Sequence, residues 1–266
     1  MNDKQFLQLI DFMGFSWQGY RKVRKGVKKR IRRHMQRLGC RDMGEYMERL
    51  EQKEEFKQEC ERMMTVSVSR FFRDQRLWEL LKNCILPELI EIYSDRVKVW
   101  SAGCACGEEV YSLMILWNHM DRTIFSLPAL DITATDLNPL YLNKAKDALY
   151  PVSSLKKVPE NLRTTFFQSE HGEKRFRVKP ALRDGIAWLT HDFFLGPPGN
   201  DFHLILIRNN LLTYYKDDRI RPVLDEIIKT LCLGGYMIIG SHEKLPFHPS
   251  LLKPCPTLSY VFKKGV

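Results

Sequence analysis

The feature that most constrains the fold is an alternation of short apolar runs with amphipathic segments from Val97 onward. The amphipathic segments span residues 108–120, 139–149 and 217–232, and the apolar runs read VKVWSAG, LDITATD, AWLTHDF, DFHLILIRNN and GGYMIIGS. Runs this short suit buried strands, and strands that alternate with helices form a mostly parallel sheet covered on both faces. The pattern therefore predicts an α/β fold.

Two stretches of the chain depart from this alternation. Residues 166–186 have polar turns and only short strand-like pieces, which predicts a small antiparallel insertion. Residues 1–66 show apolar residues at helical spacing and no strand-like alternation, so we expect several short helices there. The prediction is a helical domain at 1–66, a linker helix at 67–96, and a sheet domain at 97–266 that carries a β insertion at about 166–186.

The positive charge of the chain is concentrated near its beginning. The 266 residues carry a net charge of +10, and residues 20–39, YRKVRKGVKKRIRRHMQRLG, hold ten Lys and Arg and no acid. Such a run attracts an acidic protein helix or a nucleic acid, or forms a solvated helix face. Tyr20 is the one aromatic residue in the run, at its edge, so stacking on bases is not supported.

Ligands of a parallel sheet bind beyond the carboxyl ends of its strands. The first such end reads WSAGCACGEEVYS, where Gly103 and Gly107 allow a tight turn and the following helix offers free backbone amides. Glu109 falls in the first turn of that helix and could accept a hydrogen bond from an ammonium or hydroxyl group. The alternative is a helix N-terminus capped by acids.

Two further strand ends carry polar residues. Asp136, in TATDLNP, is placed to bind the two hydroxyls of a ribose, or else is a helix N-cap. Asn209 and Asn210 follow the apolar run LILI and Arg208, which indicates a polar pocket; the tyrosines Tyr214 and Tyr215 are either its wall or part of the core. This arrangement suits an adenosyl ligand, and the absence of a phosphate-binding lysine motif favours adenosylmethionine over a nucleotide.

At these same residues the chain resembles the CheR-type chemotaxis receptor methyltransferases, which methylate glutamate side chains with S-adenosylmethionine. The resemblance covers nearly the whole chain and rests on five strings in family order: SRFFRD, WSAGCACGEEVYSL, ATD, RNNLLTYY and LGGYMIIGSHEKLP. It implies a Rossmann-like class I methyltransferase sheet with an N-terminal helical domain and a small antiparallel β insertion. Ser67 and Ser69 stand where the family usually has Asn and Thr.

The resemblance also implies roles for individual residues. Arg73 would be catalytic, together with Tyr214 or Tyr215. The alternative role for Arg73 is an ion pair with Asp74 or Asp136. The substrate would meet basic residues of the N-terminal run, represented by Arg24, Lys28 and Arg32. The cofactor would contact residues of the linker and of the strand ends. Its pocket would be lined by Ser67, Ser69, Arg73 and Gly103. Its amino group would meet Glu109, its ribose Asp136, its adenine Asp192 and Phe193, and its methionine side Asn209 and Asn210.

The predicted activity is therefore S-adenosylmethionine-dependent esterification of glutamate side chains in a protein. A glutamate carboxylate is already ionised at pH 7, since the pKa of a free glutamate side chain is about 4.3, so the transfer needs no general base and no metal. The alternatives are a cofactor-sensing or docking module without turnover, and a methyltransferase that acts on nucleic acid or a small molecule.

The same motifs predict the partner and the location. We expect an acidic helical protein, such as a chemoreceptor, and no nucleic acid. No apolar run reaches the ~20 residues that span a bilayer, and the N-terminus lacks the pattern of a signal peptide, so we expect no membrane insertion and a cytoplasmic location. We also expect a monomer.

Overall fold

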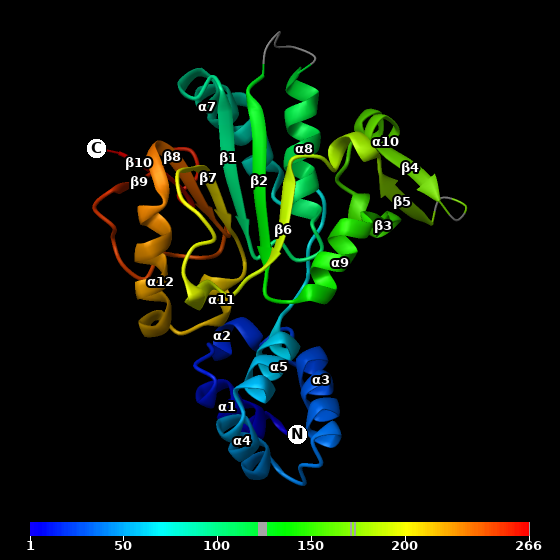
Figure 1. The fold of residues 1–266 in the computed structure, drawn as a ribbon, viewed down its shortest axis with the longest axis vertical. Helices are drawn as coiled ribbons and strands as arrows, with labels where there is room; N and C mark the ends of the chain where they lie inside the picture. Colours follow the sequence, from blue (N-terminus) through cyan, green and yellow to red (C-terminus); the bar gives the residue numbers. More distant parts are fainter. Residues whose placement is uncertain (122–126, 171, 173, 266) are drawn as a thin grey trace. The chain divides into compact units, whose positions relative to one another are not determined.

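The computed structural model describes residues 1–121, 127–170, 172 and 174–265, and it divides the chain into two compact units (Figure 1). The first unit combines Met1–Val66 with Asn209–Pro222, and the second combines Ser67–Arg208 with Val223–Val266. The helical unit is thus built from two stretches that lie far apart in the sequence. Residues 209–222 were expected within the sheet domain and belong instead to the helical unit.

The first unit is all-helical, as predicted. Its helix α3 turns one apolar side inward, where Val27, Ile31 and His34 are buried. The His34 ring bonds the Tyr46 hydroxyl at 2.7 Å and the Glu59 carboxylate at 2.9 Å, so even its buried polar side chain has partners. The helices of this unit are α1 (Asp3–Phe12), α2 (Trp17–Tyr20), α3 (Arg24–Arg37), α4 (Met43–Gln52), α5 (Glu54–Met64) and α11 (Leu211–Tyr214).

The second unit contains the predicted, mostly parallel sheet. Its seven strands lie in the order β6-β2-β1-β7-β8-β10-β9, with parallel pairing from β6 through β8 and antiparallel pairing of β10 with β8 and β9. The strands are β1 (Arg96–Ala102), β2 (Ala129–Asp136), β6 (Ile186–Thr190), β7 (Phe202–Ile207), β8 (Leu231–Ile239), β9 (Leu252–Pro254) and β10 (Val261–Lys264).

The centre of this sheet is buried on both faces. Leu204 and Leu206 of β7 join the apolar cluster formed with the helices that precede and follow β1, and the alternate residues Ile205 and Ile207 are buried on the opposite face. Figure 1 shows α7, α8 and α9 packed beside the central strands. The helices of this unit are α6 (Gln75–Leu80), α7 (Leu86–Ile92), α8 (Glu108–Asp121), α9 (Pro139–Asp147) and the part of α12 (Asp217–Lys229) that follows Pro222.

The linker differs from the single helix that was expected. The chain forms α6, then a π-helical turn at Leu81–Ile85, then α7, in which Pro87 occupies the first turn. Proline has no backbone N–H and its ring clashes with the carbonyl four residues earlier, so Pro87 disrupts the regular α-helical hydrogen bonding of this segment. Phe71 lies before α6 and is fully buried.

The antiparallel insertion is present but begins earlier than predicted. Its three strands lie in the order β3-β5-β4, so the expected RFRV piece is the central strand. Figure 1 shows these strands beyond α9, apart from the main sheet. The first strand has only three residues, too few to show a periodicity in the sequence. The elements are β3 (Leu149–Pro151), α10 (Glu160–Phe166), β4 (Phe167–Glu170) and β5 (Arg175–Val178).

No helix in the described part of the chain has both the length and the apolarity needed to cross a bilayer.

Candidate functional site

The carboxyl ends of β6, β2 and β1 adjoin at one edge of the sheet. Asp136 of β2 is in register with Thr190 of β6, and Thr135 is in register with Ala102 of β1. The His191 amide also donates to the Asp136 carbonyl at 3.1 Å. Two of the strand ends that the sequence singled out, those of β1 and β2, therefore meet at one place.

The turn after β1 is anchored to β2 by its backbone. The amides of Gly103 and Cys104 both donate to the Thr135 carbonyl at 2.8 Å, and both glycines of the turn have positive φ, 75° at Gly103 and 88° at Gly107. A Cβ on Gly107 would lie 2.9 Å from the Ala145 Cβ and 3.0 Å from the Trp188 ring. Glycine is required here both for the conformation and for close packing of protein atoms.

The Asp136 side chain is buried, with 8% of its surface exposed. Its Oδ1 accepts from the Asn138 amide at 2.8 Å and its Oδ2 from the Ala105 amide at 2.9 Å. Burial raises the pKa of Asp136 to about 6, although both hydrogen bonds oppose the shift. The N-cap of α9 is Asn138, whose side chain accepts from the Leu140 amide at 3.1 Å, so the interpretation of Asp136 as that N-cap is wrong.

Glu109 is held by two side chains rather than left as a free acid at a helix end. Ser101 Oγ donates to its Oε1 at 2.9 Å, and Arg208 Nη1 donates to its Oε2 at 3.0 Å. Arg208 is itself 8% exposed and lies 3.7 Å from the Asp74 Oδ2. Two carboxylates around one guanidinium leave a net negative charge, which favours the binding of a cationic group.

The sequence singled out Glu109 and the polar strand end at Arg208, but it did not pair them. These residues are 99 positions apart, Asp74 was considered only as an ion-pair partner of Arg73, and Ser101 was given no role. The polar residues that follow β7, beginning with Arg208, were the sequence signal that could have suggested a partner for Glu109.

Several buried polar atoms of this edge have no hydrogen-bond partner among the described residues. They are Asp74 Oδ2, Glu108 Oε2, His191 Nδ1 and Arg208 Nε. Asp74 Oδ2 has the Arg208 guanidinium at 3.7 Å, which is beyond hydrogen-bond length. An unpaired buried polar group costs about 1–3 kcal/mol, so a ligand that hydrogen-bonds these atoms would recover that cost. The set contains acceptors for an ammonium or for hydroxyls and a donor for a carboxylate, all of which S-adenosylmethionine carries.

The linker residues Ser67 and Ser69 reach the same region. The Ser69 side chain hydrogen-bonds Glu108 at the start of α8, and the Ser67 side chain hydrogen-bonds Cys106 in the glycine turn. Burial raises the pKa of Glu108 and raises that of the Cys106 thiol to about 11, so this thiol is protonated at neutral pH.

Arg73 lies in a tightly constrained segment. Its neighbours Phe72 and Asp74 have φ of 50° and 69°, in the left-handed region that residues with side chains seldom adopt. Arg73 Nη1 donates to the Val68 carbonyl at 2.8 Å, and its own carbonyl accepts from Trp78 Nε1 at 2.8 Å. The side chain of Arg73 is exposed, which suits a group that meets a ligand.

The residues expected at the adenine follow β6. Asp192 Oδ1 accepts from the Phe194 amide at 3.0 Å and caps the short turn Phe193–Leu195. The Phe193 ring lies 6.4 Å from the Trp100 ring, centroid to centroid. Both residues come directly after His191, whose amide bonds the Asp136 carbonyl.

The remaining predicted site residues lie in the helical unit. Asn209 has a φ of 56°, and Asn210 caps α11 by accepting from the Leu211 amide at 2.6 Å. The Tyr214 ring packs 4.9 Å from the Tyr20 ring, and the Tyr215 ring packs 4.7 Å from the Phe15 ring. Both tyrosine rings thus pack against the core of the helical unit, as the core interpretation predicted.

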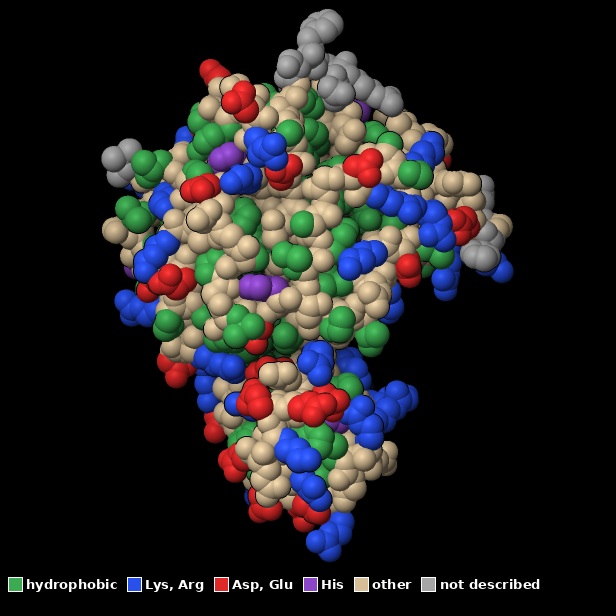
Figure 2. All heavy atoms as spheres, in the orientation of Figure 1, with side chains coloured by type: hydrophobic (Ala, Val, Ile, Leu, Met, Phe, Trp, Pro, Cys, Tyr) green, Lys and Arg blue, Asp and Glu red, His purple; other side chains and the backbone are tan. Residues whose placement is uncertain are grey.

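Basic residues of α3 form two rows that differ in their contacts. Lys28 Nζ lies 2.8 Å and Arg24 Nε 3.4 Å from the Asp3 carboxylate, and Arg32 Nη2 donates to the Met1 carbonyl at 2.8 Å. The second row, Lys25, Lys29 and Arg33, is exposed and makes no ion pair within the described residues. Figure 2 shows Lys and Arg side chains grouped along the part of the helical unit where α3 lies.

The described residues contain no group of His, Cys, Asp and Glu side chains arranged to hold a metal ion.

Comparisons with known proteins agree with the site. Residues 67–261 match the family described as CheR methyltransferase, SAM binding domain. A chemotaxis protein methyltransferase of Listeria monocytogenes is 30% identical over 219 residues, which cover 82% of this chain and 81% of that protein. Chemotaxis protein methyltransferase 1 of Pseudomonas aeruginosa is 30% identical over 244 residues, 88% of each chain.

A likeness of lower degree is found to a solved TehB-like SAM-dependent methyltransferase from Corynebacterium glutamicum. Its sequence is 15% identical, its TM-score is 0.38, and the match covers 71% of this chain and 95% of that one. The family match spans most of the chain and includes the sheet-unit residues described above as site residues. The chain therefore belongs to the CheR methyltransferase family and is an S-adenosylmethionine-dependent methyltransferase.

Proposed function

We propose that this methyltransferase esterifies glutamate side chains of an acidic, helical protein such as a chemotaxis receptor. The observation that carries the proposal is the acid-rich cluster of Asp74 and Glu109 around Arg208, beside the buried Asp136. The cluster suits a cationic methyl donor, and the relatives that match most of the chain are named chemotaxis protein methyltransferases.

The chemistry of such a transfer asks mainly for positioning. S-adenosylmethionine supplies a methyl group on a sulfonium. Asp136 would accept the ribose hydroxyls, and Glu109 would accept from the amino group. Arg73, exposed beside its strained neighbours, would orient the acceptor carboxylate. The acceptor is ionised at pH 7 and needs no deprotonation, so exclusion of water and alignment lower the barrier.

The remaining predicted site residues divide by unit. Ser67, Ser69 and Gly103 would support the cofactor from the linker and the glycine turn, and Asp192 and Phe193 would border its adenine. Asn209 and Asn210 would meet its methionine side. Tyr214 and Tyr215 pack their rings in the helical core and would hold that segment in place.

We also propose that the helical unit recognises the substrate through α3. The exposed row Lys25, Lys29 and Arg33 offers charges that are not already neutralised by Asp3, so it suits an acidic helix better than Arg24 and Lys28 do. The proposal includes a cytoplasmic location for enzyme and acceptor, and a monomeric enzyme.

The test uses the stability of the product bond. The protein is incubated with methyl-labelled S-adenosylmethionine and a bacterial lysate, the labelled protein is isolated, and mild alkali is added. Carboxyl methyl esters hydrolyse and release labelled methanol, whereas N-methyl groups do not. Label that stays on the protein in alkali, or label found on nucleic acid, would defeat the proposal.

A further inference from the structure

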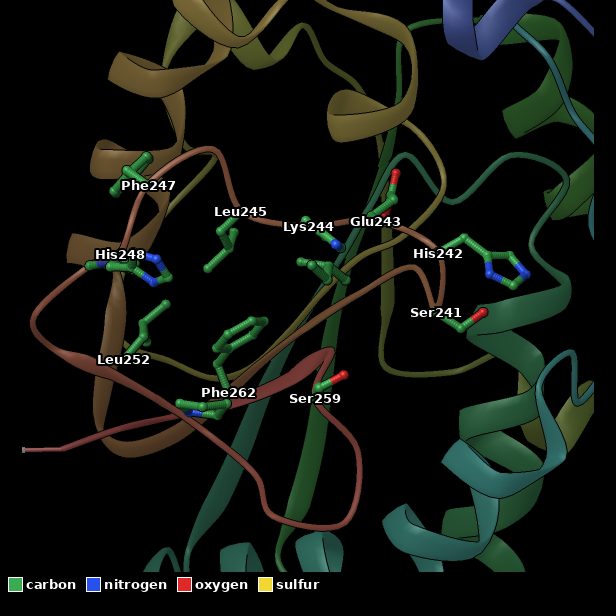
Figure 3. Close-up of a pocket in the computed structure, with 13 residues that line it drawn as sticks. Ser241, His242, Glu243, Lys244, Leu245, Phe247, His248, Leu252, Ser259 and Phe262 are labelled. Atoms are coloured by element: carbon green, nitrogen blue, oxygen red, sulfur yellow. The ribbon is translucent and has the colours of Figure 1, made fainter.

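A cavity of about 740 Å³ lies in the sheet unit, outside the strand ends described above (Figure 3). It is bounded by the segment that joins β8 to β9 and by strands β9 and β10. Its apolar lining includes Leu245, Phe247, Leu252 and Phe262, and Figure 3 shows Leu245, Leu252 and Phe262 pointing toward one another. A cavity of this size with a mainly apolar wall and a few polar groups is typical of a binding site.

The lining of this cavity carries one cationic and one anionic side chain, Lys244 and Glu243. Lys244 lines it, is exposed, and makes no ion pair within the described part of the chain. The Glu243 side chain stabilises the turn after β8, because its Oε2 accepts from the Gly240 amide at 2.6 Å. A ligand that combines an apolar group with a carboxylate would satisfy both the apolar wall and the ammonium.

The cavity is connected to the proposed transfer site through the sheet. Ile239, which lines the cavity, is in register with Ile207, the residue before Arg208. The Ile239 amide donates to the Tyr260 carbonyl at 3.0 Å, and the Tyr260 side chain hydrogen-bonds Asp74. The cavity therefore lies at the same carboxyl edge of the sheet as the Asp74, Arg208 and Glu109 cluster, one strand further along.

We infer that this cavity binds the acceptor protein next to the glutamate that is methylated. An apolar side chain of the acceptor enters the cavity, and a carboxylate near it pairs with Lys244. Acidic amphipathic helices present such pairs three or four residues apart. The inference rests on the proposed function, because it names residues that flank a methylated glutamate.

The first experiment measures binding of a defined probe to the full chain. The probe is a fluorescent helical peptide of about 18 residues with Glu and Leu on one face, and a second peptide replaces each Leu by Ala. We expect the Leu peptide to bind about fivefold more tightly in fluorescence anisotropy, since burial of apolar side chains favours binding.

Two variants and one control locate the binding. Lys244→Glu and Leu245→Glu should each weaken the Leu peptide about fivefold, and Leu245→Glu should abolish the preference for Leu over Ala. Lys253→Glu is the matched control. Lys253 is an exposed residue of β9 that does not line the cavity, and its substitution by Glu changes the charge by the same amount as Lys244→Glu. Equal effects of Lys244→Glu and Lys253→Glu, or an unchanged Leu preference in Leu245→Glu, would overturn the inference.

A second measurement separates this inference from the proposed function. The initial rate of alkali-released methanol is measured for the lysate substrate with each variant, together with the affinity for S-adenosylhomocysteine. The cavity variants should raise the apparent KM and leave cofactor affinity unchanged. Alkali-labile label with wild-type KM in the cavity variants would reject the inference alone, whereas alkali-stable label in the wild type would reject the proposed function as well.

Discussion

At the residue scale, the buried Asp136 carboxylate makes cofactor binding dependent on pH. Burial raises its pKa to about 6, so the carboxylate that would accept two ribose hydroxyls is progressively protonated below that pH. The affinity for S-adenosylhomocysteine should therefore fall as the pH is lowered from 7.5 to 5, as measured by calorimetry. Asp136→Asn should bind about tenfold more weakly at pH 7.5, because a hydrogen bond to a charged group contributes roughly 1.5–3 kcal/mol.

The same pKa shift affects stability with a defined sign. The folded state holds the Asp136 proton more tightly than the unfolded state, in which the pKa of this carboxyl is near its ordinary value of 3.8. The contribution of this group to the free energy of unfolding should therefore decrease as the pH rises from about 4 through about 6. Urea titrations at several pH values give the free energy of unfolding of the wild type and of Asp136→Asn. The slope of this free energy against pH should differ between the two proteins across that window, and identical slopes would contradict the assignment.

Gly107 tests how tightly the turn after β1 is packed. Gly107→Ala places a Cβ within 2.9 Å of the Ala145 Cβ at a φ of 88°, so it should lower the free energy of unfolding by about 2–4 kcal/mol. Gly39→Ala is the matched control, since Gly39 has a φ of 72° and no atom within 4 Å of the added Cβ. It should show only the backbone cost, about 1 kcal/mol. Equal losses in the two variants would mean that packing around Gly107 contributes nothing.

At the scale of an element, α3 separates structural from docking charges. Reversal of Lys25, Lys29 and Arg33 to Glu should raise the apparent KM for the protein substrate several-fold and leave cofactor affinity and melting temperature nearly unchanged, because exposed charges without partners contribute little to stability. Added salt should have the same effect on KM, since exposed charges are screened over ~8 Å at physiological ionic strength.

The other row of α3 provides the comparison. Reversal of Arg24, Lys28 and Arg32 removes their contacts with Asp3 and the Met1 carbonyl, so this variant should also lose thermal stability. A KM that rises equally in both triple variants would show that total charge matters and that the exposed row has no special role. Tight, salt-sensitive binding of random duplex DNA would instead favour a nucleic-acid partner.

At the scale of the whole molecule, the helical unit depends on a segment from the far part of the sequence. Tyr214 and Tyr215 pack on Tyr20 and Phe15, and Arg219 Nη1 donates to the Met13 carbonyl at 2.6 Å. A chain that begins at Ser67 would expose these rings and free the segment that carries Asn209 and Asn210. It should bind a hydrophobic dye and lose affinity for S-adenosylhomocysteine, and wild-type affinity in calorimetry would contradict this expectation.

What the sequence determined by itself was local. The alternation of apolar runs and amphipathic segments predicted the strands and most of the helices, because the periodicities of side-chain burial repeat within a few residues. The ordered motifs identified the family and its cofactor. The basic run located α3, and its helical spacing showed which side is buried.

The tertiary structure decided what depends on distant residues. Glu109 meets Arg208 because β1 and β7 are neighbours in the sheet, and strand order is not encoded in either segment alone. Residues 209–222 join the helical unit because Tyr214 and Tyr215 bury their rings on its core, a contact made across some two hundred residues. Asn138, not Asp136, caps α9, because the helix begins at Pro139, and the Asp136 carboxylate is instead shared between the Asn138 amide and the Ala105 amide of the distant glycine turn.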